Sequence, residues 1–220
     1  MGELLGRVVS VNVGLPRTVE WQGRSWTSAI WKEPVDGPIG FEGEYLAGDA
    51  VADPKVHGRR DKAVYAYARE DYAWWATELP DTDFHPGLFG ENLTTEGIDL
   101  AAAVIGERWQ VGGAVLEVAQ PRFPCAKLGM RMGDASFRQR FDKARRSGSY
   151  FRVVDPGPIG AGDEVVRLAP PPEHGITIGD VVAARFDAPA EVMERILALD
   201  IATDNMRQVA RLGLERLQKA

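Results

Sequence analysis

The chain has 220 residues, of which 45% are hydrophobic and 26% charged, the composition of an ordinary soluble globular protein. Its formal net charge of −6 argues against general nucleic-acid binding, because such binding needs a basic face. No apolar run approaches the roughly 20 residues that span a bilayer, and the N-terminus lacks the pattern of a signal peptide, so we expect a cytoplasmic protein with no membrane partner.

The first two-thirds of the chain predict β structure. Closely spaced valines favour a strand at 4–13, and the turns Gln22-Gly23 and Gly112-Gly113 predict two hairpins. The expected strands are residues 4–13, 18–21, 25–30, 107–111, 114–119, 149–154 and 164–168. We expect the last two to form a pair across the turn-rich segment 155–162.

Helices interrupt this pattern and dominate the end of the chain. Apolar residues at helical spacing predict a helix at 70–79, and Asp134 is suited to cap another at 135–147. The prolines within 169–174 indicate a stiff linker. Beyond it, the capping residues Thr177, Asp187 and Thr203 predict three helices, at 178–185, at 188–199 and after residue 203.

These patterns divide the chain into two parts. The first is a mainly β (α+β) domain at 1–170, and the second is a C-terminal three-helix appendage at 171–220. Three short helices bury too little surface to fold alone. We therefore expect the appendage to dock onto the β-rich body or onto a second subunit, which leaves a homodimer open.

The single cysteine, Cys125, cannot form an internal disulfide, so any chemistry must come from its free thiol. It lies in a proline-rich segment at 120–128, directly after an expected strand, with Arg122 and Lys127 close in sequence. Neighbouring cations favour the thiolate, the form that attacks electrophiles and binds soft metals. The alternative is that Cys125 is a small buried hydrophobic residue.

A basic run at 55–62 is unusual in so acidic a chain. It contains four cations and His57 within eight residues. One reading is a solvated surface; the other is a local patch that attracts a small anion.

Three segments, at 48–64, 86–97 and 120–128, together resemble the MOSC domain family, named after the C-terminal part of molybdenum cofactor sulfurase. The closer resemblance is to its stand-alone bacterial YiiM-type branch. It covers roughly residues 5 to 170, and the helical tail resembles the three-helix appendage of that branch. One departure concerns the usual His-Gly-Gly run, which here reads His57-Gly58-Arg59. Arg59 removes backbone freedom and adds a charge.

The resemblance implies a β-barrel-like fold that binds the molybdenum cofactor (molybdopterin), with Cys125 as the thiolate ligand of the metal. It leaves pyridoxal phosphate binding open. His57 is either a structural residue or a polar neighbour of the metal that orients substrate or passes a proton. A phosphate and a polar pterin call for cations and amides. The residues expected to bind the cofactor are Lys55, Arg59, Arg60, Asn92, Arg122 and Lys127.

For function, the resemblance implies reduction of small N-hydroxylated or N-oxygenated compounds, such as hydroxylaminopurines. Electrons come from separate proteins in this interpretation, because the sequence has no ferredoxin, flavin or haem motif. The alternative is a sulfur or molybdenum-cofactor carrier that holds a persulfide on Cys125 without redox turnover. A third possibility is a structural or interaction protein in which Cys125 is inert.

Overall fold

A computed structural model describes residues 2–52 and 60–219. The strands of these residues are β1 (Glu3–Val13), β2 (Arg17–Trp21), β3 (Arg24–Ser28), β4 (Glu33–Pro34), β5 (Phe41–Glu42), β6 (Tyr45–Leu46), β7 (Val64–Ala68), β8 (Leu93–Glu96), β9 (Arg108–Val111), β10 (Ala114–Pro121), β11 (Ser149–Asp155) and β12 (Glu164–Arg167). The helices are the short 3-10 helix η1 (Arg60–Lys62), α1 (Arg69–Glu78), α2 (Ala126–Arg131), α3 (Phe137–Ala144), α4 (Ile178–Ala183), α5 (Ala190–Ala198) and α6 (Asp204–Gln218).

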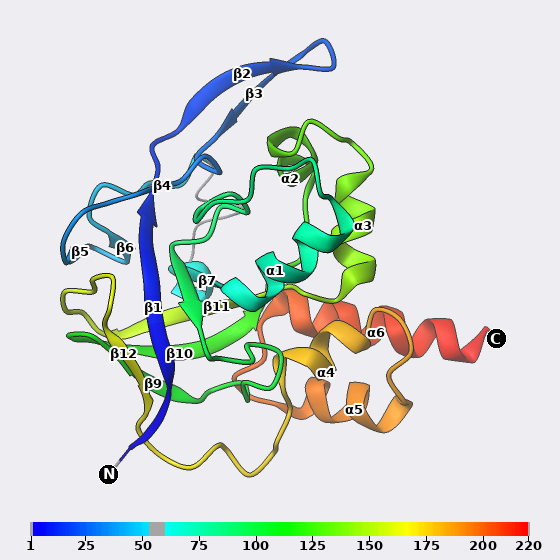
Figure 1. Cartoon of the computed structure of the whole chain (residues 1–220). Helices are drawn as coiled ribbons and strands as arrows, with labels where there is room; N and C mark the ends of the chain where they lie inside the picture. Colours follow the sequence, from blue (N-terminus) through cyan, green and yellow to red (C-terminus); the bar gives the residue numbers. More distant parts are fainter. Residues whose placement is uncertain (1, 53–59, 220) are drawn as a thin grey trace.

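Seven strands form a closed barrel in the order β12, β9, β10, β11, β7, β8 and β1, and β1 pairs back with β12. Only the pair β7–β8 is parallel among these neighbours. The barrel and its surrounding helices confirm the mainly β, α+β fold class with a β-barrel. Figure 1 shows α4, α5 and α6 gathered on one side, and the hairpin β2–β3 extending away from the barrel.

Both predicted hairpins form. Gln22 and Gly23 have φ values of 51° and 71°, the left-handed pair that a tight two-residue turn requires. Gly112 has a φ of 55°, and a Cβ there would lie 2.0 Å from Asp163 Oδ2. The second hairpin, β9–β10, therefore depends on glycine both for backbone conformation and for space.

The predicted pairing of the two late strands is wrong. β11 pairs with β10 and β7, whereas β12 pairs with β9 and β1. The hairpin β9–β10 lies between them in the barrel, so each late strand covers a different edge of that hairpin. The local turn at 155–162 suggested a simple hairpin, but closure of the barrel overrides it.

Two of the three predicted N-cap residues of the appendage cap their helices in the structure. Thr177 makes a capping box with Asp180, and Thr203 accepts a hydrogen bond from the Met206 N–H, as expected for α4 and α6. Asp187 does not cap α5; Pro189 is the N-cap residue, and Asp187 pairs with Arg145 instead. The expected helix at 135–147 is shorter at both ends.

The appendage packs on the barrel. Apolar residues of α4, α5 and α6 belong to the same buried cluster as the barrel interior. The Thr203 hydroxyl donates to Gln120 Oε1 over 2.6 Å, and Arg152 Nη2 donates to the Ile201 carbonyl over 3.1 Å. Docking onto the β-rich body was one of the two arrangements expected from the sequence. Within the described residues, no helix is both long and apolar enough to cross a membrane.

A second buried cluster, of mostly aromatic side chains, supports the site. It joins α1 and α3 to Tyr65 and Tyr67, which point out of the barrel from β7, and to the loop before β8. Phe89 packs against two tyrosines of this cluster: its ring centroid lies 4.9 Å from that of Tyr67 and 5.0 Å from that of Tyr72. Such contacts fix the loop that carries residues 86–92 against the barrel.

Candidate functional site

Strand β10 delivers the cysteine to the site. The strand ends at Pro121, residues 122–125 form a loop, and α2 begins at Ala126, with Cys125 as its extended N-cap residue. Arg122 is buried and Cys125 is half-buried. The thiol therefore lies at the end of a rigid strand, as the sequence predicted.

Arg122 is held rigidly beside the thiol. One nitrogen of its guanidinium group donates to the Phe89 carbonyl, and the group lies 5.0 Å from the ring centroid of Tyr65. Burial alone would lower the pKa of Arg122, but Tyr65, Tyr150 and Cys125 together raise it above its usual value. Arg122 is thus a permanent cation whose charge stabilises an ionised sulfur at Cys125.

The second charged part of the site is a buried ion pair. Lys32 Nζ pairs with Asp49 Oδ1, and both side chains are less than a tenth exposed. Asp49 also accepts from the Gly14 N–H over 2.9 Å and from Asn92 Nδ2 over 2.8 Å. Burial lowers the pKa of Lys32, and the positive charge of Arg122 lowers it further. The carboxylates of Asp49 and Glu91 act in the opposite direction and offset this effect only in part.

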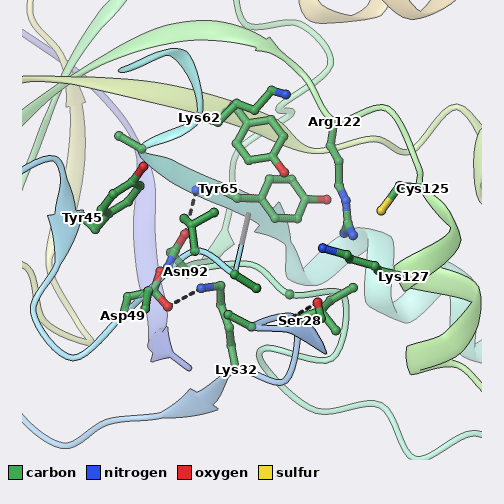
Figure 2. Close-up of a pocket in the computed structure, with 18 residues that line it drawn as sticks. Ser28, Lys32, Tyr45, Asp49, Lys62, Tyr65, Asn92, Arg122, Cys125 and Lys127 are labelled. Atoms are coloured by element: carbon green, nitrogen blue, oxygen red, sulfur yellow. Dashed lines mark hydrogen bonds and ion pairs between the residues drawn. The ribbon is translucent and has the colours of Figure 1, made fainter. Parts of the chain in front are cut away.

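These groups line one cavity of about 630 Å³, a volume that includes its open mouth. Figure 2 shows Cys125, Arg122 and Lys127 together on one side, and Lys32, Asp49 and Tyr45 on another. The polar and aromatic side chains that line it are Ser28, Lys32, Tyr45, Asp49, Lys62, Tyr65, Asn92, Arg122, Cys125, Lys127 and Tyr150. Among the described lining residues four are cations and one is a carboxylate, so the cavity favours an anionic ligand.

Tyrosines form one wall of the cavity and stay neutral. Burial raises the pKa of Tyr65 and of Tyr150, while Arg122 opposes the rise in both cases. The Tyr65 hydroxyl donates to the Ser147 carbonyl over 2.8 Å, and its ring lies 4.9 Å from that of Tyr150. The wall therefore offers flat apolar surface beside the cations.

Glu91 is a buried acid that does not line the cavity. Its Oε1 accepts from the Tyr72 hydroxyl, the Gly87 N–H and the Thr94 hydroxyl. Burial raises the pKa of Glu91, and these hydrogen bonds offset part of the rise. Its contacts anchor the loop before β8, so Glu91 acts here as a structural residue.

The structure brings together Cys125, Asn92, Arg122 and Lys127 from the residues predicted to act. Arg60 is exposed on η1 and does not line the cavity, whereas Lys62 of the same basic run does. Lys55, His57 and Arg59 lie outside the described residues, so their roles stay predictions.

The side chain of Asn92 lines the cavity but is already hydrogen-bonded to other residues of the protein. Its Nδ2 donates to Asp49 and to the Asn12 carbonyl, and its Oδ1 accepts from the Tyr65 N–H. Both amide hydrogens are used, so only the oxygen keeps a free acceptor position for a ligand.

Sequence reasoning assigned no role in the site to Lys32 or to Asp49. Lys32 belongs to no motif, and its one signal is a charge directly after the apolar residues 29–31. Such a pattern usually means that a chain is returning to the surface. Only the packed structure shows this ammonium turned inward.

The fold and site define a class: a small closed β-barrel with flanking helices and an open basic cavity that holds one thiol. The chain belongs to the MOSC domain family, whose model matches residues 53–166. It is 34% identical to YflK of Bacillus subtilis over 171 residues, which are 78% of this chain and 76% of YflK. These matches confirm the family expected from the three segments.

Two other relatives match only part of their own length. YiiM of Escherichia coli is 37% identical over 61% of this chain, and the match spans 61% of YiiM. A protein named reductase from Gibberella moniliformis is 33% identical over 84% of this chain, and the match spans 35% of that protein.

Solved structures show the same architecture over nearly the whole chain. YiiM from Geobacillus stearothermophilus superimposes with a TM-score of 0.76 at 27% identity, over 94% of this chain and 98% of that one. YiiM from Escherichia coli gives a TM-score of 0.68 at 25% identity, over 86% and 89% of the two chains.

Proposed function

We propose that this protein is an oxidoreductase that binds the molybdenum cofactor through Cys125 and reduces N-hydroxylated compounds such as hydroxylaminopurines. The observation that carries the proposal is the half-buried thiol, which faces a basic cavity beside a permanent cation, Arg122. Membership of the MOSC domain family and a relative named reductase support it.

The donor set of the cavity suits this cofactor. Among the described residues, no three His, Cys, Asp or Glu side chains gather to hold a bare metal ion. A single thiolate is what a metal needs when it arrives with its own dithiolene ligand. Cys125 would hold the metal, Arg122, Lys62 and Lys127 would hold the phosphate, and the Tyr65 ring would offer apolar surface to the rest of the cofactor.

When bound, the cofactor supplies two-electron redox chemistry at the metal. The protein supplies the rest. The charge of Arg122 favours the thiolate form of Cys125, and the β10–α2 junction fixes where that sulfur points. The neutral tyrosines keep water away from one side of the cavity, and the lysines hold the negative charges of the cofactor in place.

Burial of Cys125 argues for this proposal over a persulfide carrier. A sulfur carrier must present its cysteine to two partner proteins in turn, which suits an exposed and flexible segment. Cys125 is half-buried between a buried arginine and the start of a helix. We assign electron delivery to separate proteins, because no electron-carrier motif is present in the sequence.

The test compares wild-type protein with Cys125→Ser, both purified from a host that makes the cofactor. Molybdenum per chain and reduction of 6-N-hydroxylaminopurine by reduced methyl viologen are measured, with Ser25→Ala on the exposed hairpin as control. We expect Cys125→Ser to lose turnover and most of its molybdenum, while Ser25→Ala keeps both. Loaded wild-type protein without turnover would overturn the reductase proposal. An added sulfur on Cys125 after treatment with a cysteine desulfurase would favour the carrier.

A further inference from the structure

Lys32 has an environment that the binding role of the other cations does not explain. Among the described lysines it alone is buried, and it lines the same cavity as Cys125. A lysine that merely attracts an anion works well from a half-exposed position, as Lys62 and Lys127 do. Removal of an ammonium group from water is unfavourable, so a buried one that faces a cavity calls for a function.

The surroundings of Lys32 keep its amine in one place. Its Nζ pairs with Asp49, which is in turn fixed by the Gly14 N–H and by Asn92 Nδ2. A Cβ on Gly87 would lie 2.4 Å from the Lys32 carbonyl oxygen, so the backbone is also packed tightly. The amine is therefore preorganised before any ligand arrives.

The environment of Lys32 lowers the pKa of its ammonium group. The charged groups with a marked effect on it are Asp49, Glu91 and Arg122. Burial and Arg122 disfavour the ammonium form, whereas Asp49 and Glu91 favour it, and the balance lowers the pKa. A lysine with a lowered pKa gives up its proton more readily near neutral pH than a solvated one.

Reduction of an N-hydroxyl group needs protons as well as electrons. In R–NH–OH + 2 e⁻ + 2 H⁺ → R–NH₂ + H₂O, the N–O bond breaks and the oxygen leaves as water. The two electrons come from one-electron carrier proteins. Without a proton the oxygen would leave as hydroxide, which is a poor leaving group in a partly enclosed cavity.

Three other groups in the lining, Arg122, Tyr65 and Tyr150, are poorer donors. Arg122 does not release its proton in this pH range. Burial raises the pKa of Tyr65 and Tyr150, so both phenols hold their protons more tightly. Tyr65 has also committed its hydroxyl hydrogen to the Ser147 carbonyl.

We infer that Lys32 is a catalytic residue, the general acid that protonates the departing oxygen of the N-hydroxylated substrate. This rests on the proposed reductase function. Lys32 gives one proton to the oxygen as the N–O bond breaks, and solvent supplies the other proton, which goes to the nitrogen. Asp49 keeps the neutral amine in position until solvent at the open mouth reprotonates it.

The first test measures the amine itself in protein as purified. Lysine labelled with ¹³C at Cε is incorporated, and Lys32→Met identifies the Lys32 resonance. We expect Lys32 to titrate at lower pH than the exposed Lys143 on α3. Titration together with Lys143 would overturn the inference, whatever the activity of the enzyme.

The second test separates proton transfer from charge. Lys32→Arg keeps a cation that cannot donate, so we expect kcat to fall about 100-fold, the usual contribution of a general acid. Molybdenum content should stay at the wild-type level, and Lys143→Met is the control. The acid form is the active one, so wild-type kcat should fall as pH rises through the Lys32 pKa, and Lys32→Arg should lose that limb.

Each outcome bears on a different claim. Wild-type kcat in Lys32→Arg, or loss of molybdenum from it, would overturn the general-acid role and leave the reductase proposal standing. Loaded wild-type protein without turnover would instead overturn the reductase function.

Lys32→Met leaves the buried Asp49 carboxylate without its cation, so the single variant can fail to fold. The double variant Lys32→Met/Asp49→Asn removes that charge as well. It should fold, bind molybdenum and turn over as slowly as Lys32→Arg.

Discussion

The side chain of Asn92 joins three segments that are distant in sequence. Its hydrogen bonds reach Tyr65 on β7, Asn12 on β1 and Asp49 on the loop after β6. Of the three partners, Tyr65 and Asp49 line the cavity, and Asp49 is also the partner of Lys32. One buried carboxamide thus ties the barrel to the site.

Replacement of Asn92 should therefore weaken the whole fold. Asn92→Ala leaves the buried Tyr65 N–H without its acceptor and removes a donor from the Asp49 carboxylate. We expect the free energy of unfolding to fall by about 3 kcal/mol, measured by urea denaturation. Gln208→Ala, an amide lost from the exposed face of α6, should change it by less than about 0.5 kcal/mol. Equal stability of the two variants would contradict this role.

At this scale the sequence predicted residues that belong to motifs and missed those that do not. One short segment contains Cys125, Arg122 and Lys127, and these residue types together indicate a reactive thiol. Lys32 acquires its importance from burial and from Asp49, 17 positions away. Arg60 and Lys62 differ by two positions in the same basic run, yet only Lys62 lines the cavity. Which face of a short 3-10 helix points inward is decided by packing, which residue types do not reveal.

Among the elements, α6 contacts its neighbours through a glycine. Gly213 is buried, and a Cβ there would lie 2.6 Å from the Ala184 carbonyl oxygen and 2.2 Å from Met193 Sδ. Helix α6 can approach α4 and α5 closely only because this position has no side chain. The backbone carbonyl cannot move aside as a flexible side chain can.

Two effects oppose each other in Gly213→Ala. Alanine favours a helix interior by about 1 kcal/mol over glycine. Overpacking against a backbone atom costs typically 1–3 kcal/mol. We expect net destabilisation, seen as a lower urea midpoint. Gly179→Ala in α4 is the matched control, because its Cβ would lie 3.2 Å from the nearest atom and need only a small adjustment. A Gly213→Ala protein more stable than wild type would show that α6 packs less closely than described.

Elements with local signals were predicted well. Thr177 and Thr203 cap their helices, and both glycine-containing turns join the expected strands. Strands β7 and β8 were missed, because β7 is buried along its whole length and its sequence lacks the alternation of a half-buried strand. The pairing of β12 with β1 joins residues about 160 positions apart, and no local pattern encodes it.

On the scale of the whole molecule, the appendage and the barrel share one buried cluster. Met193, Ile196 and Met206 belong to it together with Val8 and Leu116 of the barrel. Polar links cross the same boundary, because Arg152 pairs with Asp61 beside the cavity and also donates to the Ile201 carbonyl. The division at residue 170 stays a prediction about folding units, and this packing argues that the two parts depend on each other.

Two spectroscopic probes can separate these possibilities in the intact chain. All six tryptophans lie before residue 110, so their fluorescence follows the barrel, the helix α1 packed on it and the β2–β3 region. Of the α-helical residues in the described part of the chain, more than half lie in α4, α5 and α6, so circular dichroism at 222 nm reports mainly on the appendage. A shared core means that loss of the helices exposes apolar barrel residues to water, which destabilises the barrel at the same urea concentration. We expect coincident midpoints, and Gly213→Ala should lower both by the same amount although it lies 104 residues beyond the last tryptophan, Trp109. Loss of helix signal before any change in fluorescence would instead mean that the appendage folds as a separate unit.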